Sequence, residues 1–193
     1  MNSKSEKFFI NHLTELKKSL DEIHIERVVT ISELIYEAYR KNKQIFIMGN
    51  GGSAATASHF ACDLGKGTIV EGKPRFRVMS LNDNTPLITA LSNDFGYDRV
   101  FVEQLMNLVQ KGDIVICITG SGNSPNVLKA IKYANSKGAI TIAFLGFSGG
   151  KAKNMVQEHI TISNRDYGQV ESVHVILAHA VAQYFKNKIE TKL

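Results

Sequence analysis

The sequence predicts an α/β fold in which helices cover both faces of a parallel sheet. Two observations support this prediction. Short runs rich in β-branched and apolar residues recur along the chain, and segments with the apolar spacing of helices separate them. Because strand-helix-strand units form right-handed parallel crossovers, this alternation indicates a parallel sheet between two helical layers. The runs expected to form strands are residues 44–48, 76–81, 113–119, 139–145 and 160–163.

Two amphipathic helices are expected before the first strand, over residues 6–20 and 25–41. In the first, Leu13, Leu16 and Leu20 recur at three- and four-residue steps, which places them on one face of the helix. Such added helices would bury their apolar faces against another subunit. The final helix is expected over residues 169–189, and its largely apolar surface also indicates a homo-oligomer.

The composition favours some classes of protein and excludes others. With 193 residues, 44% of them hydrophobic and 21% charged, the chain can bury one core. We expect a single domain with a helical extension at 1–42 and an α/β core at 43–193. The longest apolar runs, 114–118 and 139–145, are far shorter than the roughly 20 residues of a membrane-spanning helix. The net charge of +5 is spread along the chain, which argues against nucleic-acid binding.

The N-terminal sequence and the cysteines predict a cytoplasmic protein. The first residues are polar and charged, without the basic and then apolar pattern of a secretory signal. The two cysteines, Cys62 and Cys117, do not suggest a disulfide framework.

A glycine-rich segment follows the first expected strand. Residues 49–53 read Gly-Asn-Gly-Gly-Ser, and we call this segment the glycine turn. Glycines allow a sharp turn and a close approach to a ligand, and free amides at the start of the next helix favour an anion. A tight turn with Ser53 as an ordinary helix cap explains the segment equally well.

The third expected strand leads into a second turn of the same kind, residues 119–124, which we call the serine turn. It combines the hydroxyls of Thr119, Ser121 and Ser124 with two glycines, directly before a helix expected over 126–137. Hydroxyls and free amides at a helix start form a phosphate site without a formal charge. The segment is not a P-loop, because no Gly-Lys-Ser/Thr follows. The carboxyl ends of the strands would bring both turns to one crevice.

Three motifs in this order resemble the sedoheptulose 7-phosphate isomerases of the sugar isomerase (SIS) family. They are the glycine turn, the Ser-Gly-Asn-Ser core of the serine turn, and Asn-Asp-Phe-Gly-Tyr at 93–97. The likeness covers nearly the whole chain. It implies a five-stranded flavodoxin-like SIS domain, a homotetramer and a sugar-phosphate substrate. It also implies interconversion of sedoheptulose 7-phosphate with a D-glycero-D-manno-heptose 7-phosphate, an early step toward the heptose of lipopolysaccharide or capsule.

Aldose-ketose isomerisation needs a base at carbon, a group that shuttles hydroxyl protons, and stabilisation of an enediolate. His59 and Asp63 are four residues apart and share a face of the helix after the glycine turn. Glu171 and His179, eight residues apart in the last helix, differ by about 80° around its axis. One metal ion could gather all four side chains only if the two helices face each other.

By resemblance, His59, Asp63, Glu171 and His179 are the positions that bind a divalent metal, zinc, in the family. Asp63 and His179 are likewise its acid/base positions. Asp63 replaces the family's glutamate, and Glu171 replaces its glutamine, so Glu171 is a second candidate for the base. The extra carboxylate lowers the net charge of the site, which should weaken the pull of the metal on a carbonyl. The substrate-binding positions implied are Asn50, Gly51, Gly52, Ser53, Asn93, Asp94, Thr119, Gly120, Ser121, Ser124 and Glu171.

Other interpretations stay open at this point. Gly120 replaces a usual threonine, and Asn93 with Asp94 would also suit a simple turn. His174 cannot share a site with His179 and is expected to be packed or at an interface, and Cys62 is expected to be a small buried residue. The chain could be a non-catalytic SIS module that senses a sugar phosphate or acts as a scaffold. It could also isomerise another phosphosugar.

Overall fold

The computed structural model describes residues 3–191, which contain a five-stranded parallel sheet with the order β2-β1-β3-β4-β5. This is the flavodoxin-like order, as the resemblance implied. Every neighbouring pair of strands is parallel, with Ile45 opposite Ile114 and Ile114 opposite Ile140 across the centre. The strands are β1 (Gln44–Gly49), β2 (Arg77–Ser80), β3 (Ile114–Thr119), β4 (Ile140–Gly146) and β5 (Glu158–Ile162).

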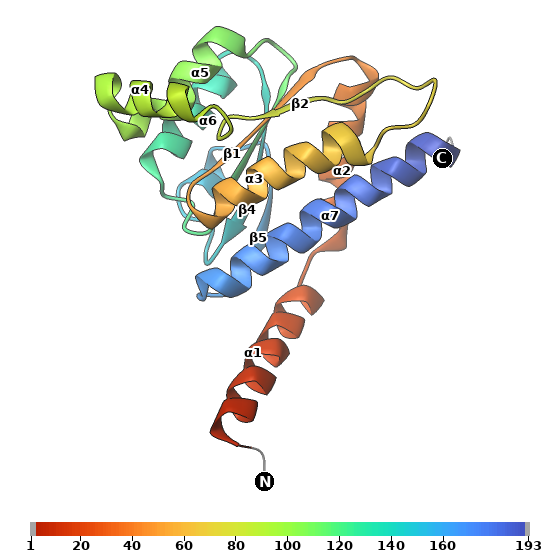
Figure 1. Ribbon diagram of the computed structural model, residues 1–193, viewed down its shortest axis with the longest axis vertical. Helices are drawn as coiled ribbons and strands as arrows, with labels where there is room; N and C mark the ends of the chain where they lie inside the picture. Colours follow the sequence, from red (N-terminus) through yellow and green to blue (C-terminus); the bar gives the residue numbers. More distant parts are fainter. Residues whose placement is uncertain (1–2, 192–193) are drawn as a thin grey trace.

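Helices cover both faces of the sheet, as the alternating pattern predicted (Figure 1). One face carries α2 (Ile25–Arg40), α3 (Gly52–Cys62) and α7 (Tyr167–Thr191). The other face carries α4 (Thr85–Phe95), α5 (Val100–Leu108) and α6 (Pro125–Ser136). Because side chains alternate along a strand, Ile45 and Ile47 of β1 pack in the first core, while Phe46 and Met48 pack in the second.

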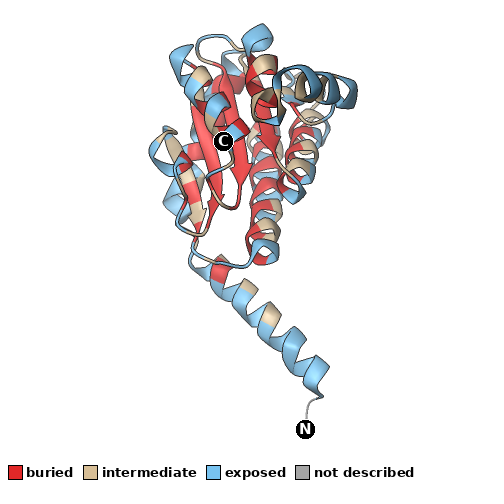
Figure 2. Ribbon diagram, turned by 90° about the vertical axis from the view of Figure 1, so that its left-hand side faces the viewer, coloured by how far each residue is buried: buried red, intermediate tan, exposed pale blue. Residues whose placement is uncertain are grey.

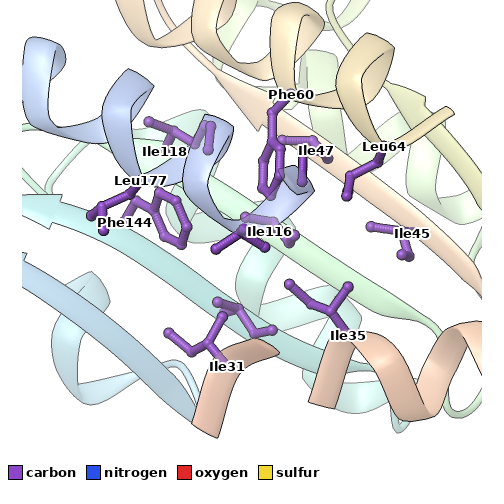
Figure 3. Packing of buried hydrophobic residues seen from close by; sticks show 14 of the residues in the cluster. Ile31, Ile35, Ile45, Ile47, Phe60, Leu64, Ile116, Ile118, Phe144 and Leu177 are labelled. Atoms are coloured by element: carbon purple, nitrogen blue, oxygen red, sulfur yellow. The ribbon is translucent and has the colours of Figure 1, made fainter. Parts of the chain in front are cut away.

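The first core fixes the helices that carry the candidate site. Figure 3 shows Phe60 of α3 and Leu177 of α7 packed over Ile116, Ile118 and Phe144 of the central strands. All of these side chains are at most 5% exposed. Burial of such large apolar side chains anchors α3 and α7 side by side on the same face of the sheet.

The first helix, α1 (Lys4–Asp21), projects from the rest of the molecule (Figures 1 and 2). It begins with a capping box, in which the Ser3 side chain accepts from the Glu6 amide and the Glu6 carboxylate accepts from the Ser3 amide. Most of its surface is exposed, including Phe8, Phe9 and Leu13. Its main contacts with the rest of the chain are with α7.

Three short helical segments and the start of one strand depart from the predicted pattern. A π-helical segment, η1 (Asp63–Gly67), continues α3, and 3₁₀ turns occur at η2 (Tyr97–Arg99) and η3 (Ala152–Asn154). The edge strand β5 begins two residues earlier than expected, because half-buried Glu158 and His159 lack the apolar character used to find it.

None of the helices in the described part of the chain has both the length and the apolar character that crossing a membrane requires.

Two side-chain predictions have opposite outcomes. His174 is fully buried, as expected, with its Nε2 atom 3.2 Å from the Leu145 carbonyl oxygen. The prediction that Cys62 is buried is wrong, because Cys62 lies on the solvent side of the last turn of α3.

Candidate functional site

The glycine turn lies where β1 passes into α3. A Cβ atom on Gly49 would lie 2.5 Å from the backbone oxygen of Ser53, so only glycine fits this bend. The residue at the N-cap is Gly51, not Ser53, so the interpretation of Ser53 as an ordinary cap is wrong. Ser53 instead lies in the first turn of α3, where it is 4% exposed.

The carboxylate of Glu171 lies directly against this turn. A Cβ atom on Gly52 would be 2.2 Å from Glu171 Oε2, so the glycine makes room for the carboxylate. An acidic side chain at the N-terminus of a helix is stabilised by the helix dipole. The start of α3 is therefore already next to a negative charge, that of Glu171. Because this charge would repel a phosphate, the serine turn is the more favourable phosphate site.

The serine turn joins β3 to α6 and is largely organised by its own hydroxyls. Thr119 Oγ1 accepts from the Gly122 amide, and Ser121 Oγ accepts from the Asn123 amide, both at 3.2 Å. Ser124 is the N-cap of α6, and its hydroxyl makes no capping bond within the described residues. The Ser124 hydroxyl thus remains available to a ligand at the N-terminus of α6.

The space next to Gly120 is occupied by a neighbouring aromatic ring. A Cβ atom on Gly120 would lie 3.0 Å from two ring carbons of Tyr167, at the start of α7. A longer side chain at position 120, such as the threonine that the resemblance implied, would therefore meet the Tyr167 ring.

His59, Asp63 and His179 form a compact group between α3 and α7. The two Nε2 atoms of the histidines are 2.9 Å apart, and Asp63 Oδ2 lies 3.3 Å from His59 Nε2 and 3.6 Å from His179 Nε2. The buried neighbour Phe60 fixes the rotation of α3, and the contact of His59 with His179 shows that His59 emerges on the side that faces α7. We call these three residues the His-Asp-His group.

The spacing of the group suits a metal ion. A tetrahedral zinc ion with bonds of about 2.0–2.1 Å places neighbouring ligand atoms about 3.3–3.4 Å apart. The three observed distances scatter around that value, and all three ligand atoms lie within 4.8 Å of one another. Two imidazoles and one carboxylate suit zinc or another divalent transition metal, with positions left for a substrate. Glu171, the fourth residue expected from the sequence, lies outside the group.

Hollows on both sides of the His-Asp-His group connect it to the surface. One, of about 370 Å³, is lined by Asp63, Gly67, His179, Ala182, Gln183 and Lys186. The other, of about 320 Å³, is lined by Gly52, Ala55, Thr56, His59, Gly168, Glu171, Ser172 and Val175. A ligand could therefore reach the group from either side of the contact between α3 and α7.

The Asn93 and Asp94 side chains lie farther along the chain, in the last turn of α4, where both are exposed. The alternative of a simple turn at these residues is wrong, because both are helical. Asn93 Nδ2 donates to Asp94 Oδ1 at 2.9 Å. The link from this segment to the glycine turn is made by Tyr97, whose hydroxyl donates to Asn50 Oδ1 at 2.8 Å.

Sequence reasoning missed Tyr97 and Asn126 as site residues. Asn126, in the first turn of α6, exchanges two hydrogen bonds with Asn50. Position in the sequence was the signal available. Tyr97 is the last residue of the motif at 93–97, and Asn126 lies two residues after the end of the serine turn.

Comparisons with known proteins show the family to which the chain belongs. The sequence model of the SIS domain matches residues 8–146. The phosphoheptose isomerase of Aliarcobacter butzleri is 33% identical over 189 residues, covering 98% of this chain and 99% of that protein. The Aquifex aeolicus phosphoheptose isomerase is 32% identical over 91% of both chains. The structure of phosphoheptose isomerase from Neisseria gonorrhoeae superposes with a TM-score of 0.87 at 29% identity, covering 94% of this chain and 98% of that one.

Proposed function

Because this chain belongs to the SIS domain family and is a phosphoheptose isomerase within it, we propose that it isomerises sedoheptulose 7-phosphate between α3 and α7. The product is a D-glycero-D-manno-heptose 7-phosphate. The observation that carries the proposed location is the convergence of His59, Asp63 and His179 from two helices beside the glycine turn. The proposed acid/base pair is Asp63 and His179.

We propose that the His-Asp-His group holds a divalent metal ion, zinc, through the two Nε2 atoms and Asp63 Oδ2. The distances among these atoms support the assignment. When bound, such an ion polarises the sugar carbonyl and stabilises the negative charge that develops on its oxygen. Glu171 is proposed as a substrate-binding residue rather than as a fourth ligand, because its carboxylate lies against Gly52.

The serine turn would hold the phosphate of the substrate. Ser124 Oγ and the amides at the start of α6 supply donors for an anion without adding a formal charge. Thr119 and Ser121 keep the turn in shape through their bonds to Gly122 and Asn123. The remaining proposed contacts with sugar hydroxyls are made by Asn50, Ser53, Asn93 and Asp94.

The proton transfers are assigned to the atoms of Asp63 and His179 that lie outside the ligand set. Asp63 Oδ1 takes a proton from the carbon next to the carbonyl of the ketose and returns it to the neighbouring carbon of the aldose. His179 Nδ1 exchanges a proton between the two hydroxyl positions of the enediolate. Both residues flank one hollow, which allows them to act on the same sugar.

Turnover of sedoheptulose 7-phosphate in deuterated water tests this proposal. The purified enzyme should incorporate deuterium at C2 of the aldose, because the proton passes through a solvent-exchangeable base. Asp63→Asn should lower turnover at least about a hundredfold, the scale expected for loss of a general base. Asp21→Asn, which alters an exposed carboxylate at the end of α1, is the matched control. Full activity of Asp63→Asn would reject the assignment, and a panel of five-, six- and seven-carbon sugar phosphates tests the substrate.

We propose that the enzyme is a cytoplasmic homotetramer. In support, Phe8, Phe9 and Leu13 on α1 are each more than 60% exposed, at 64%, 62% and 63%. Free Cys62 and Cys117 suit a reducing compartment. Leu13→Lys should lower the mass measured by light scattering during size-exclusion chromatography, whereas Lys17→Glu on an exposed, already charged position should not. An unchanged mass for Leu13→Lys would argue against α1 as the interface.

A further inference from the structure

The side chains of Asn50 and Asn126 join the glycine turn to the serine turn. Asn50 Nδ2 donates to Asn126 Oδ1 at 3.0 Å, and Asn126 Nδ2 donates to Asn50 Oδ1 at 2.9 Å. The hydroxyl of Tyr97 donates to the same Asn50 Oδ1 atom at 2.8 Å. Since Asn126 is only 2% exposed, water competes little for this pair of hydrogen bonds.

A backbone amide fixes the orientation of both side-chain amides. The Val127 N–H donates to Asn126 Oδ1 at 2.9 Å. A backbone N–H can only donate, so the atom that it faces must be the oxygen of Asn126. The Asn126 amide therefore presents its oxygen to Asn50 Nδ2 and its nitrogen to Asn50 Oδ1. If the Asn50 amide were reversed, two donors and two acceptors would face each other, so Asn50 also has one orientation.

This arrangement leaves Asn50 with one defined donor. An amide nitrogen carries two protons, and Asn126 uses one of those on Asn50 Nδ2. Asn50 Oδ1 is meanwhile engaged by Tyr97 and Asn126. The second proton on Asn50 Nδ2 thus keeps a fixed direction at the turn that leads into α3, the helix that carries His59 and Asp63.

We propose that Asn126 and Tyr97 are positioning residues for the isomerase, acting through Asn50. They direct the second Asn50 proton toward the sugar phosphate. They also hold the serine turn, with its phosphate, at a constant distance from α3, the helix that carries His59 of the His-Asp-His group. A small displacement between a bound phosphate and the reacting groups lowers the rate without preventing binding. This inference rests on the proposed function.

Tyr97→Phe tests the inference with little risk to folding. Tyr97 is 54% exposed and the variant keeps the ring, so the melting temperature should equal that of the unaltered enzyme. Loss of one neutral hydrogen bond should lower kcat/KM by about threefold to tenfold. We expect most of the decrease in kcat, because the substrate still binds but is less well placed. Tyr133→Phe on α6 is the matched control, since Lys137 Nζ lies over the Tyr133 ring and the Tyr133 hydroxyl is not among the groups that bond to Asn50 or Asn126 in the described residues.

A second variant tests whether the two hydrogen-bond donors to Asn50 Oδ1 act together. Asn126→Asp keeps an oxygen for the Val127 and Asn50 donors but no longer donates to Asn50 Oδ1. Combined with Tyr97→Phe, it deprives that oxygen of both donors. The loss in kcat of the double variant should therefore exceed the product of the losses of the single variants.

The outcomes distinguish failure of the positioning role from failure of the proposed function. An active enzyme with unaltered kcat in Tyr97→Phe would overturn the positioning role and leave the proposed function intact. Equal losses in Tyr97→Phe and Tyr133→Phe would also overturn it, because a specific link to Asn50 would then be unnecessary. An unaltered protein that fails to isomerise sedoheptulose 7-phosphate would overturn the proposed function itself.

Discussion

The buried His174 should make the stability of the fold depend on pH in a defined window. Burial lowers the pKa of His174 from 6.5 to about 4, although the contact with the Leu145 carbonyl acts in the opposite direction. Its Nδ1 atom is buried without a hydrogen-bond partner among the described residues, so the folded protein disfavours the charged ring. In the unfolded chain the ring is exposed and takes up a proton near pH 6.5.

The direction of the pH dependence follows from the number of protons that the folded and unfolded chains bind at His174. Between pH 6.5 and about 4 the unfolded chain binds a proton at His174 that the folded chain does not, so stability falls as the pH falls. At about 1.4 kcal/mol for each pH decade, the contribution lost by pH 4 is about 3 kcal/mol. Above pH 6.5 this contribution is fully present.

Urea unfolding at pH 7.5 and pH 4, at one protein concentration, measures this effect. His174→Gln retains an N–H donor for the Leu145 carbonyl but does not titrate. The difference in unfolding free energy between the unaltered protein and this variant should change by about 3 kcal/mol between the two pH values. His24→Gln is the control, because the His24 side chain is 72% exposed. If the His174→Gln and unaltered proteins lose stability in parallel, the reasoning is refuted.

Two further predictions follow from the geometry of the site. Glu171→Gln should retain the metal measured by mass spectrometry of the purified protein, whereas His59→Ala should lose it. Of these two residues, His59 belongs to the His-Asp-His group and Glu171 does not. A metal-free Glu171→Gln protein would contradict this ligand set. Gly49→Ala should destabilise the fold by about 2 kcal/mol in thermal unfolding, because the new Cβ would lie 2.5 Å from the Ser53 backbone. Gly67→Ala, where a Cβ meets no atom of residues 3–191 within 4 Å, is its control, and equal melting temperatures of the two variants would contradict the reasoning.

The sheet was predictable because its central strands are buried on both faces. Runs such as 114–118 must be apolar throughout, and such runs stand out in a single sequence. The edge strand β5 is less apolar, so its first two residues were missed. The π-helical segment at Asp63 was also missed, since an extra residue in a helical turn leaves no periodic signal over five residues.

The site was predictable in its residue types but not in its grouping. The sequence places His59 and Asp63 on one helix face, and helical geometry alone brings them together. Whether His179 or Glu171 meets them depends on how α7 crosses α3, which is set by the packing of Phe60 and Leu177 on the sheet. The pair of Asn50 and Asn126 likewise depends on the distance between two turns, which one sequence does not encode in any local pattern.

The position of Glu171 determines how its negative charge would act on a metal ion in the His-Asp-His group. If Glu171 were a ligand together with Asp63, two carboxylates would cancel the charge of a divalent ion. In the structure the Glu171 carboxylate lies against Gly52, where the start of α3 carries a partial positive charge of about half an electron. A divalent ion in the His-Asp-His group would then face one carboxylate and two neutral imidazoles and retain a net charge of +1 for polarising a carbonyl. With Asp63 as the proposed base, the ion would therefore keep the electrophilic assistance that the sequence alone led us to expect to be weakened.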